Sequence, residues 1–489
     1  MPVPFAAVPA APVLLWFGDD LRLDDNPALV AAAESGRPLV ALFVLDEAAG
    51  RPPGGASRWW LHHALAGLDR ALRACGVPLV LRRGRAGAIV PAVADACGAG
   101  LVVWNRRADG AAAAGEEAIA ATLQEQGRSV HRFLADRLFA PGAVVTGGGR
   151  PYRVFTPFWK AAMAGPAPRM PKPAPQALTG FAAPPAGLAL ADLSLLPARP
   201  DWAGGLRAQW SEAGRGPDEA MAQAGLARFL DRTLAGYADA RDGIAADATS
   251  RLSPWLRFGQ ISPRRIFHSV RMRVADDDRD AGKFLAELGW REFCRGLADQ
   301  FPDLAEAPID PRFGAFPWRD DPAGLAAWQK GETGIPLVDA AMRALWQTGF
   351  IHNRARMVAA SYLVKHLLID WRQGERWFWD TLVDADSASN PASWQWVAGC
   401  GADAAPFIRI FNPVLQGERF DPAGAYVRRF VPELARLPDA WLHRPWMAPA
   451  SVMAAAGIRL GRDYPLPVVE PDAGRRRALA AFEALRAGP

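Results

Sequence analysis

Short apolar runs that alternate with helical stretches fill the first third of this 489-residue chain. The runs are rich in Val and Leu and occupy Val13–Phe17, Pro38–Leu45, Leu79–Arg82, Leu101–Asn105 and Val130–Phe133. Helical stretches such as Arg58–Cys75 and Ala86–Ala96 separate them. Because buried parallel strands read as continuous apolar runs and need crossover connections, the alternation predicts a doubly wound, Rossmann-like parallel sheet over residues 13–141. The sequence has no G-x-G-x-x-G or P-loop motif, so we expect no conventional dinucleotide site there.

The composition divides the rest of the chain into two parts. Residues 142–216 are rich in Pro, Gly and Ala with little periodicity, which predicts a linker between domains. Helical patterns with many aromatic residues follow, and they predict an all-helical domain over residues 217–489. The Pro-rich residues 1–12 lack a basic region, so we expect a flexible N-terminal tail and not a signal peptide.

Charge and cysteine usage limit the classes of function. The net charge of +5 is compatible with a nucleic acid partner but does not require one. The four Cys residues have no paired spacing, which indicates reduced thiols in a cytoplasmic protein. The seven His residues show no metal-ligand spacing, so we expect no metal site. No apolar run approaches the length of a membrane span.

Polar groups concentrate in residues 349–396, a stretch that is otherwise apolar enough to be core. The groups are, in order, Asn353, Arg354, Arg356, Met357, Asp384, Asp386, Trp394 and Trp396. Asn353, Arg356 and Met357 fall at i, i+3 and i+4, so they share one helical face. Inward-facing polar groups need partners, and these either satisfy one another or line a cofactor pocket. Because a guanidinium fork suits a carboxylate, we expect Arg356 to pair with Asp384.

Two further segments allow more than one interpretation. In residues 248–254, ATSRLSP, hydroxyls and backbone amides precede a helix, which indicates either a local hydroxyl cap or an anion site. In residues 284–293, Glu287 and Trp290 share a helical face, whereas Arg291 points elsewhere, toward solvent or phosphate. Trp290 is either a core residue or a platform on which a base stacks.

Together these motifs resemble the photolyase/cryptochrome flavoproteins, most closely the cyclobutane pyrimidine dimer (class I-type) DNA photolyases. The resemblance covers nearly the whole chain and is strongest from Tyr237 to Glu433. It implies an N-terminal α/β domain that holds an antenna chromophore and a C-terminal all-helical domain that binds FAD. The implied activity is that of a deoxyribodipyrimidine photo-lyase: reduced FAD passes a light-driven electron to a flipped dimer in damaged DNA.

The resemblance also assigns residues to roles. The implied FAD contacts are Tyr237, Thr249, Ser250, Arg251, Leu252, Ser253, Asn353, Arg356, Asp384, Asp386 and Asn390. The implied catalytic contacts to the dimer are Glu287, Trp290, Asn353, Met357 and Trp396. The implied DNA contacts are Arg241, Trp290, Arg291, Arg354, Trp396 and Arg409. Trp394, Trp371 and Trp318 match the positions of an electron-transfer chain from the flavin to the surface.

Other readings within the family remain open. A cryptochrome-type blue-light photoreceptor and a six-four photoproduct photolyase are the alternatives. Asn390 beside the flavin and the pair His352-Asn353 favour dimer repair over either one. The antenna is methenyltetrahydrofolate, a deazaflavin or absent, because Ala112 stands where folate-binding members place an acid, although Glu116 lies close by. The expected partner is ultraviolet-damaged DNA, and the expected oligomeric state is monomeric.

Overall fold

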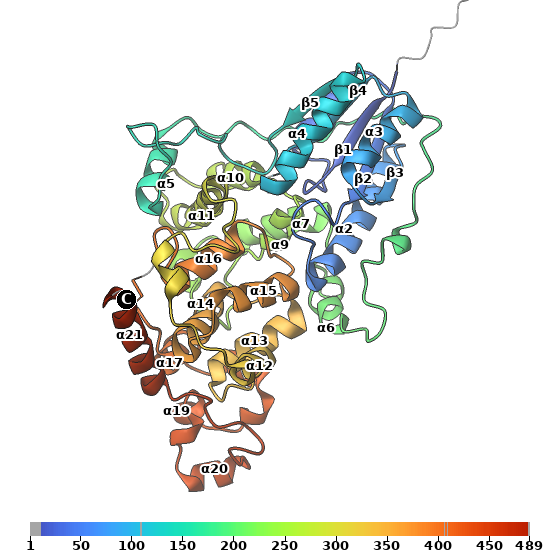
Figure 1. Ribbon diagram of the computed structural model, residues 1–489. Helices are drawn as coiled ribbons and strands as arrows, with labels where there is room; N and C mark the ends of the chain where they lie inside the picture. The colour runs from blue at the N-terminus through green and yellow to red at the C-terminus, as the bar shows by residue number, and fades with distance from the viewer. Residues whose placement is uncertain (1–10, 108–109, 405, 408, 488–489) are drawn as a thin grey trace, which may run out of the picture.

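The computed structural model describes residues 11–107, 110–404, 406–407 and 409–487. Most of the predicted N-terminal tail, residues 1–10, lies outside the described residues. The chain forms an α/β part followed by a larger helical part, with a long connection running over the surface between them (Figure 1).

The N-terminal part is built on a parallel sheet, as its sequence pattern predicts. Its five strands are ordered β3-β2-β1-β4-β5, so the direction of connection reverses between β1 and β4. The strands are β1 (Val13–Phe17), β2 (Leu39–Leu45), β3 (Leu79–Arg83), β4 (Leu101–Asn105) and β5 (Ser129–Phe133). Every residue of β1, β2 and β4 is buried, because helices cover both faces. Ligands of such sheets bind where the connection reverses, at the carboxyl ends of the strands.

The helices of this part divide between the two faces of the sheet. Alternate residues of β1 belong to different apolar clusters, Val13, Leu15 and Phe17 to one and Leu14 and Trp16 to the other. The first cluster receives side chains of α1 (Pro27–Glu34) and α2 (Gly55–Ala74), and the second those of α3 (Ala86–Cys97) and α4 (Gly110–Glu125). The prediction of a doubly wound sheet is confirmed.

The connection after β5 is more than a spacer. It contains α5 (Phe155–Ala164), η1 (Leu190–Leu193), α6 (Gly204–Leu206) and η2 (Arg207–Glu212). The Leu39 amide donates to the Thr179 carbonyl oxygen at 2.7 Å, so part of the connection lies beside the start of β2. The helix α5 packs against the long helix α11 (Arg279–Gln300) of the helical part.

The helical part begins at α7 (Glu219–Arg232) and ends at α21 (Pro471–Ala487). Its helices up to residue 381 are α8 (Tyr237–Ala240), α9 (Ser253–Arg257), α10 (Pro263–Arg271), α11, η3 (Pro311–Ala315), α12 (Pro322–Lys330), α13 (Pro336–Thr348), α14 (Asn353–Ser361), η4 (Tyr362–Leu367) and α15 (Trp371–Thr381). The later ones are α16 (Ser389–Ala398), α17 (Pro413–Phe420), α18 (Ala425–Phe430), η5 (Pro432–Leu434), α19 (Asp439–Leu442), η6 (Pro445–Met447) and α20 (Ala450–Ala456). None of the described helices is both long and apolar enough to cross a membrane.

Buried contacts lock the two parts together. The guanidinium of Arg22 donates to the carbonyl oxygens of Gly259 at 2.7 Å and Ala135 at 3.0 Å. A Cβ at Gly259 would lie 2.1 Å from the carbonyl oxygen of Asp19, and φ there is +62°, so the close approach requires glycine. One apolar cluster also extends from the sheet into the helical part. The relative placement of the two parts is therefore fixed by core packing.

Candidate active site

The carboxylate of Asp384 joins three separate segments of the helical part. It lies in the loop between α15 and α16, with its side chain 2% exposed. Its Oδ2 accepts hydrogen bonds from Arg356 Nη2 of α14 at 2.7 Å and from Ser253 Oγ of α9 at 2.6 Å. The predicted pairing of Arg356 with Asp384 is confirmed. Its Oδ1 is buried without a partner among the described residues, which leaves an acceptor for a bound group.

The loop before α9 has a shape that a simple helix cap does not explain. No side chain caps the N-terminus of α9. Arg251 has a φ of +52°, a left-handed conformation that non-glycine residues adopt at a cost of about 1 kcal/mol. Its side chain pairs with Asp247 at 2.9 Å and lies over the ring of Phe350. The Ser250 Oγ instead accepts from the Leu252 amide before the helix, at 3.4 Å, and both Thr249 and Ser250 are half-buried.

The other FAD contacts expected near this loop are deeply placed. Leu252 is 2% exposed and Tyr237 is 5% exposed. The Tyr237 ring meets Phe229 and Phe284 edge-on, and the guanidinium of Arg241 lies over it at 5.3 Å. Both residues belong to the apolar cluster that extends from the sheet into the helical part.

Asp386 is a buried carboxylate held in its ionised form. Its Oδ1 accepts hydrogen bonds from the backbone amides of Ala388 at 2.9 Å and Ser389 at 2.6 Å. Burial alone raises the pKa of Asp386, but the nearby guanidinium of Arg295, the Ser389 amide and Arg291 outweigh it and hold the pKa below its usual value. Asp386 therefore fixes the start of α16 with a full negative charge.

Asn390 is oriented by two residues that the sequence analysis missed. Its Nδ2 donates to the Glu375 side chain at 2.8 Å and to the Glu375 carbonyl oxygen at 3.1 Å. Glu375 is 1% exposed and pairs with Arg51 of the α/β part at 2.6 Å. Because both amide hydrogens face Glu375, the Asn390 Oδ1 is turned away and can accept from a bound group. An acid on the apolar face of the aromatic helix WRQGERWFWDT is the signal that could have identified Glu375.

The residues expected to contact a DNA lesion come from three helices that pack together. The helices α11 and α14 both pack against α16. Glu287 and Trp290 lie on α11, Asn353 on α14 and Trp396 on α16. Trp290 and Trp396 are half-buried, and Asn353 is exposed with its Nδ2 3.8 Å from the sulfur of Met357 on the next turn. Glu287 forms an ion pair with Arg241.

His352 holds the start of α14 in place. Its Nδ1 accepts from the backbone amide of Arg354 at 3.2 Å, and its Nε2 lies 2.9 Å from the carbonyl oxygen of Arg241. Burial lowers the pKa of His352 to about 4, so the ring is neutral at neutral pH. Since Nδ1 accepts, the single proton is on Nε2 and is donated to Arg241.

The arginines expected to contact DNA fall into two groups. Arg354 pairs with Asp242 at 2.7 Å and lies over Phe420, and Arg409 is exposed in the loop after α16. Arg291 is placed differently, because its side chain is only 10% exposed. Its Nη1 donates to the Asp136 carbonyl oxygen at 2.5 Å, inside the contact between the two parts. The expectation that Arg291 points toward solvent or phosphate is therefore corrected, and it is not proposed as a DNA contact.

The three tryptophans of the expected electron-transfer chain differ in burial. Trp371 is 0% exposed, Trp394 is 2% exposed, and Trp318 is half-buried. The Trp394 ring lies against Gly374 of α15, where a Cβ would come within 2.2 Å of it. Its described ring neighbours are Phe378 at 5.0 Å and Trp328 at 6.1 Å. No ring contact among the described residues joins two of the three tryptophans, so their sequence in a chain stays a prediction.

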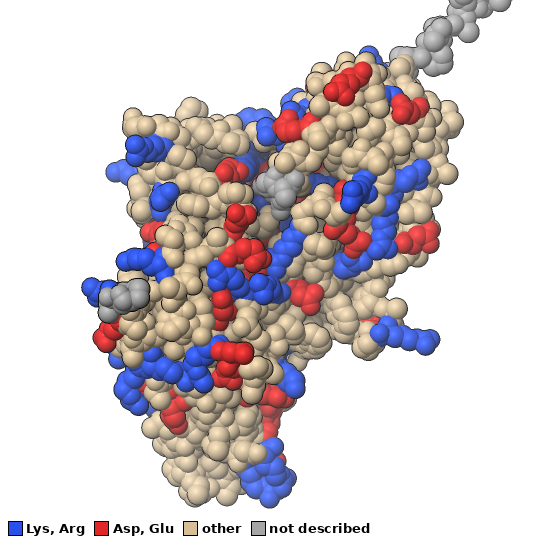
Figure 2. All heavy atoms as spheres, viewed as in Figure 1, with Lys and Arg blue, Asp and Glu red and all other residues tan. Residues whose placement is uncertain are grey.

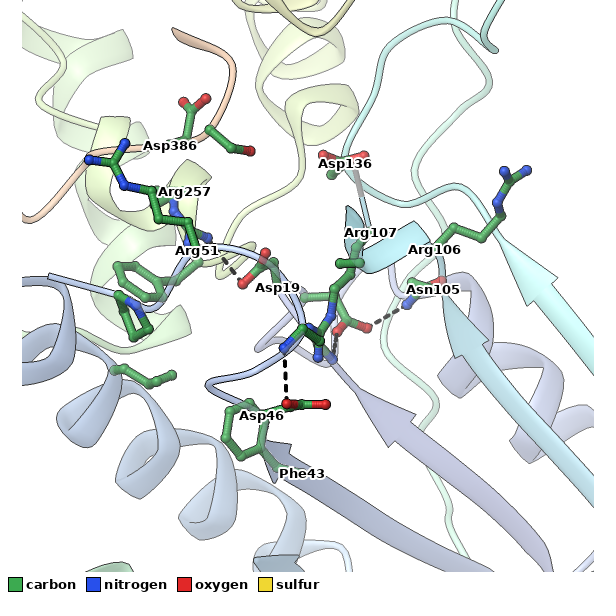
Figure 3. A pocket seen from close by; sticks show the side chains of 18 of the residues that line it. Asp19, Phe43, Asp46, Arg51, Asn105, Arg106, Arg107, Asp136, Arg257 and Asp386 are labelled. Carbon is green, nitrogen blue, oxygen red and sulfur yellow. Dashed lines mark hydrogen bonds and ion pairs between the residues drawn. The ribbon is translucent and has the colours of Figure 1, made fainter. Parts of the chain in front are cut away.

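A pocket opens between the two parts, at the carboxyl ends of β1, β2 and β4 (Figure 3). Arg257 and Asp386 of the helical part face Asp19 across it, with Arg257 3.0 Å from the Asp19 carboxylate. A second cavity beside it is lined by Trp16, Arg107 and Glu116 among others. Burial raises the pKa of Glu116 to about 7 despite the nearby Arg107. Glu116 is therefore a buried acid in the wall of this second cavity.

The surface charge is mixed on the face shown in Figure 2. Lys and Arg side chains alternate there with Asp and Glu, and no large area carries one sign. This pattern agrees with the small net charge of +5.

Comparisons with known proteins agree with this architecture. A family described as DNA photolyase matches residues 13–176, and one described as the FAD binding domain of DNA photolyase matches residues 284–484. A deoxyribodipyrimidine photo-lyase of Agrobacterium fabrum is 48% identical over 97% of this chain and 98% of the relative. Cryptochrome-1 of Arabidopsis thaliana is 39% identical over 95% of this chain and 69% of the relative.

The similarity extends to solved structures. A bacterial class III photolyase from Agrobacterium tumefaciens superposes with a TM-score of 0.94, at 47% identity and 99% coverage of both chains. The sequence motifs favoured the class I-type members, whereas this structural neighbour is a class III enzyme. By sequence and by fold, this chain belongs to the photolyase/cryptochrome family of FAD-binding proteins.

Proposed function

We propose that this protein is a light-dependent DNA repair enzyme, a deoxyribodipyrimidine photo-lyase that splits cyclobutane pyrimidine dimers. The observation that supports the proposal is the packing of α11 and α14 against α16, because these three helices carry Glu287, Trp290, Asn353 and Trp396. Two indoles, a carboxylate and an amide suit a flipped pair of bases, which offers flat faces and hydrogen-bonding edges. The similarity to photo-lyases over nearly the full length supports the same function.

The residues around Asp384 fit FAD. The buried and unpartnered Asp384 Oδ1, the Arg356 guanidinium and the turned-away Asn390 Oδ1 offer both acceptors and donors to a flavin nucleotide. Ser253, at the end of the loop of residues 249–253, donates to Asp384 Oδ2 at 2.6 Å. When bound in its reduced form, FAD supplies the light-driven electron that opens the cyclobutane ring.

The protein's own residues bind and orient the substrate. Trp290 and Trp396 hold the dimer between aromatic surfaces, while Glu287 and Asn353 hydrogen-bond its base edges and Met357 contacts it from α14. Arg241, Arg354 and Arg409 contact flanking phosphates, so binding weakens as salt concentration rises. Arg241 and Arg354 each have a carboxylate partner in the free protein, and phosphate competes with that partner. Burial of the dimer also excludes water from the reacting bonds.

A cryptochrome-type blue-light photoreceptor is the second candidate. The 39% identity to a plant cryptochrome favours it, since both classes use the same flavin domain. Repair of six-four photoproducts is a weaker candidate, because Asn353 follows His352 where those enzymes carry two His residues. We further propose that the protein is a cytoplasmic monomer that binds an antenna chromophore. The free state of all four Cys residues agrees with a reducing compartment.

Substitution of the proposed lesion contacts tests the function directly. Glu287→Ala or Trp290→Ala should weaken binding of dimer-containing DNA by about 10- to 100-fold, since loss of one stacked base contact costs about 1–3 kcal/mol. Flavin content should not change, because neither residue is among the proposed FAD contacts. Gln300→Ala, at the far end of the same helix, is the matched control. Normal dimer binding and repair by both variants would contradict the proposed lesion site.

A further inference from the structure

The indole of Trp290 is stacked on an aromatic ring from the connection between the two parts. Phe155, the first residue of α5, lies parallel to Trp290, with ring centroids 3.8 Å apart and an angle of 8° between the planes. Phe155 is buried, at 8% exposure, whereas Trp290 is half-buried. One face of the indole is therefore covered by Phe155, and a base can stack only on the other.

The parallel arrangement is not what close packing of aromatic rings usually selects. Isolated aromatic pairs prefer offset or edge-to-face contacts to a direct face-to-face one. The neighbouring Phe293 follows that preference, because it meets Trp290 at 85° and Phe155 at 80°. Its edge therefore contacts both stacked rings and resists rotation of either plane.

The helix that carries Phe155 is held at two places, in its middle and at its N-terminus. A Cβ at Gly289 would lie 2.5 Å from the ring of Trp159, so α5 approaches α11 as closely as a glycine allows. At the N-terminus of α5, the backbone amide of Phe155 donates to Asp403 Oδ2 at 3.1 Å. Asp403 belongs to the loop that follows α16, the helix of Trp396. Phe155 is thus tied to both walls of the proposed lesion site.

We infer that Phe155 is a positioning residue for lesion recognition, which fixes the plane of Trp290 so that a flipped pyrimidine dimer meets a preformed stacking surface. The inference rests on the proposed function, because it assigns Trp290 to the dimer. Phe155 itself does not touch the substrate. A fixed indole binds a base with less loss of side-chain freedom than a mobile one.

The test measures the affinity of two variants for single-dimer oligothymidine and for the undamaged oligonucleotide. Phe155→Leu and Phe155→Met both keep an apolar side chain but remove the parallel ring. We expect about threefold to tenfold weaker binding of the dimer oligonucleotide, as for the loss of one aromatic pair, with unchanged binding of undamaged DNA. Phe158→Leu is the matched control, because Phe158 belongs to the same helix but has no described ring contact with Trp290. Its described ring contacts are with Tyr152, Phe155 and Phe293.

A double-mutant cycle separates positioning from general loosening of the cluster. If Phe155 acts through Trp290, Phe155→Leu causes no further loss in a Trp290→Leu background. Unchanged dimer affinity in both Phe155 variants, an equal loss in Phe158→Leu, or a full additional loss in the Trp290→Leu background would each overturn the inference. If the wild-type protein itself fails to distinguish dimer DNA, the proposed function falls and this inference falls with it.

Discussion

At the scale of single residues, the site depends on buried carboxylates whose partners are distant in the sequence. Asp384 binds Arg356 and Ser253, Asp386 binds backbone amides at the start of α16, and Glu375 binds Asn390 and Arg51. Each carboxylate loses its hydration on burial, and hydrogen bonds from two or more donors compensate for that loss. Such groups fix geometry better than they add stability, which suits a site that must orient a cofactor.

Asp384→Asn tests this role at one atom. The substitution keeps the size of the side chain but removes the charge that faces Arg356, whose own side chain is 25% exposed. We expect the free energy of unfolding to fall by about 2–3 kcal/mol and FAD retention to fall with it. The measurement is flavin content after gel filtration together with denaturant unfolding. Asp239→Asn, in the exposed pair with Arg279, should change neither, and equal behaviour of the two variants would contradict the account.

Trp394 is the residue on which the proposed electron-transfer chain depends. It is buried, and its ring lies against Gly374 of α15, the helix that begins at Trp371. Trp394→Phe should slow photoreduction of oxidised flavin but leave repair by chemically reduced protein intact, which transient absorption can measure. Trp328→Phe removes a ring that touches Trp394 but lies outside the proposed chain, so it should leave photoreduction fast. Unchanged photoreduction in Trp394→Phe would remove Trp394 from the chain.

At the scale of elements, α14 shows how a helix start is adapted to a site. Its N-cap is His352, an uncommon capping residue, which accepts from the Arg354 amide through a neutral ring. The same ring donates to the carbonyl oxygen of Arg241, which precedes the loop of residues 242–252. The cap therefore joins the helix that carries Asn353 and Arg356 to the segment that carries the proposed phosphate contact.

This cap predicts a pH dependence of stability. The folded-state pKa of His352, about 4, lies below its ordinary value of 6.5, so the unfolded chain binds more protons between these values. The contribution of the neutral His352 ring to the free energy of unfolding is fully present above pH 6.5. It is lost as pH falls toward 4, by up to about 3 kcal/mol. His352→Asn keeps a capping group without this titration. The difference in the free energy of unfolding between pH 7.5 and pH 5 should therefore be smaller for this variant than for the wild-type protein. An equal difference in the two proteins would contradict the prediction.

At the scale of the whole molecule, the parallel sheet can be predicted from the sequence far better than the contacts between the two parts can. The five strand ranges agree with the structure to within one residue, because buried parallel strands leave continuous apolar runs in the sequence. The pair Arg51–Glu375 links positions 324 residues apart, and no local pattern encodes it. The direction of Arg291 was mispredicted for the same reason, since helical periodicity does not reveal that the α/β part covers that face.

The connection between the parts shows a second limit of the sequence pattern. Its Pro- and Gly-rich composition predicts a linker, and much of it does run over the surface (Figure 1). The short helix α5 within it nevertheless supplies Phe155 to the proposed lesion site. The aromatic residues around Phe155 give no signal of that kind, because the partner Trp290 lies more than one hundred residues away.

The most direct test of the central claim is light-driven repair by the complete protein. Ultraviolet-irradiated oligothymidine is mixed with the reduced FAD-bound protein, illuminated with blue light, and followed by the recovery of thymine absorbance. We expect recovery that requires both light and reduced flavin. Protein that holds reduced FAD but restores no absorbance under light would contradict dimer repair, and the six-four lesion would then be the next substrate to examine.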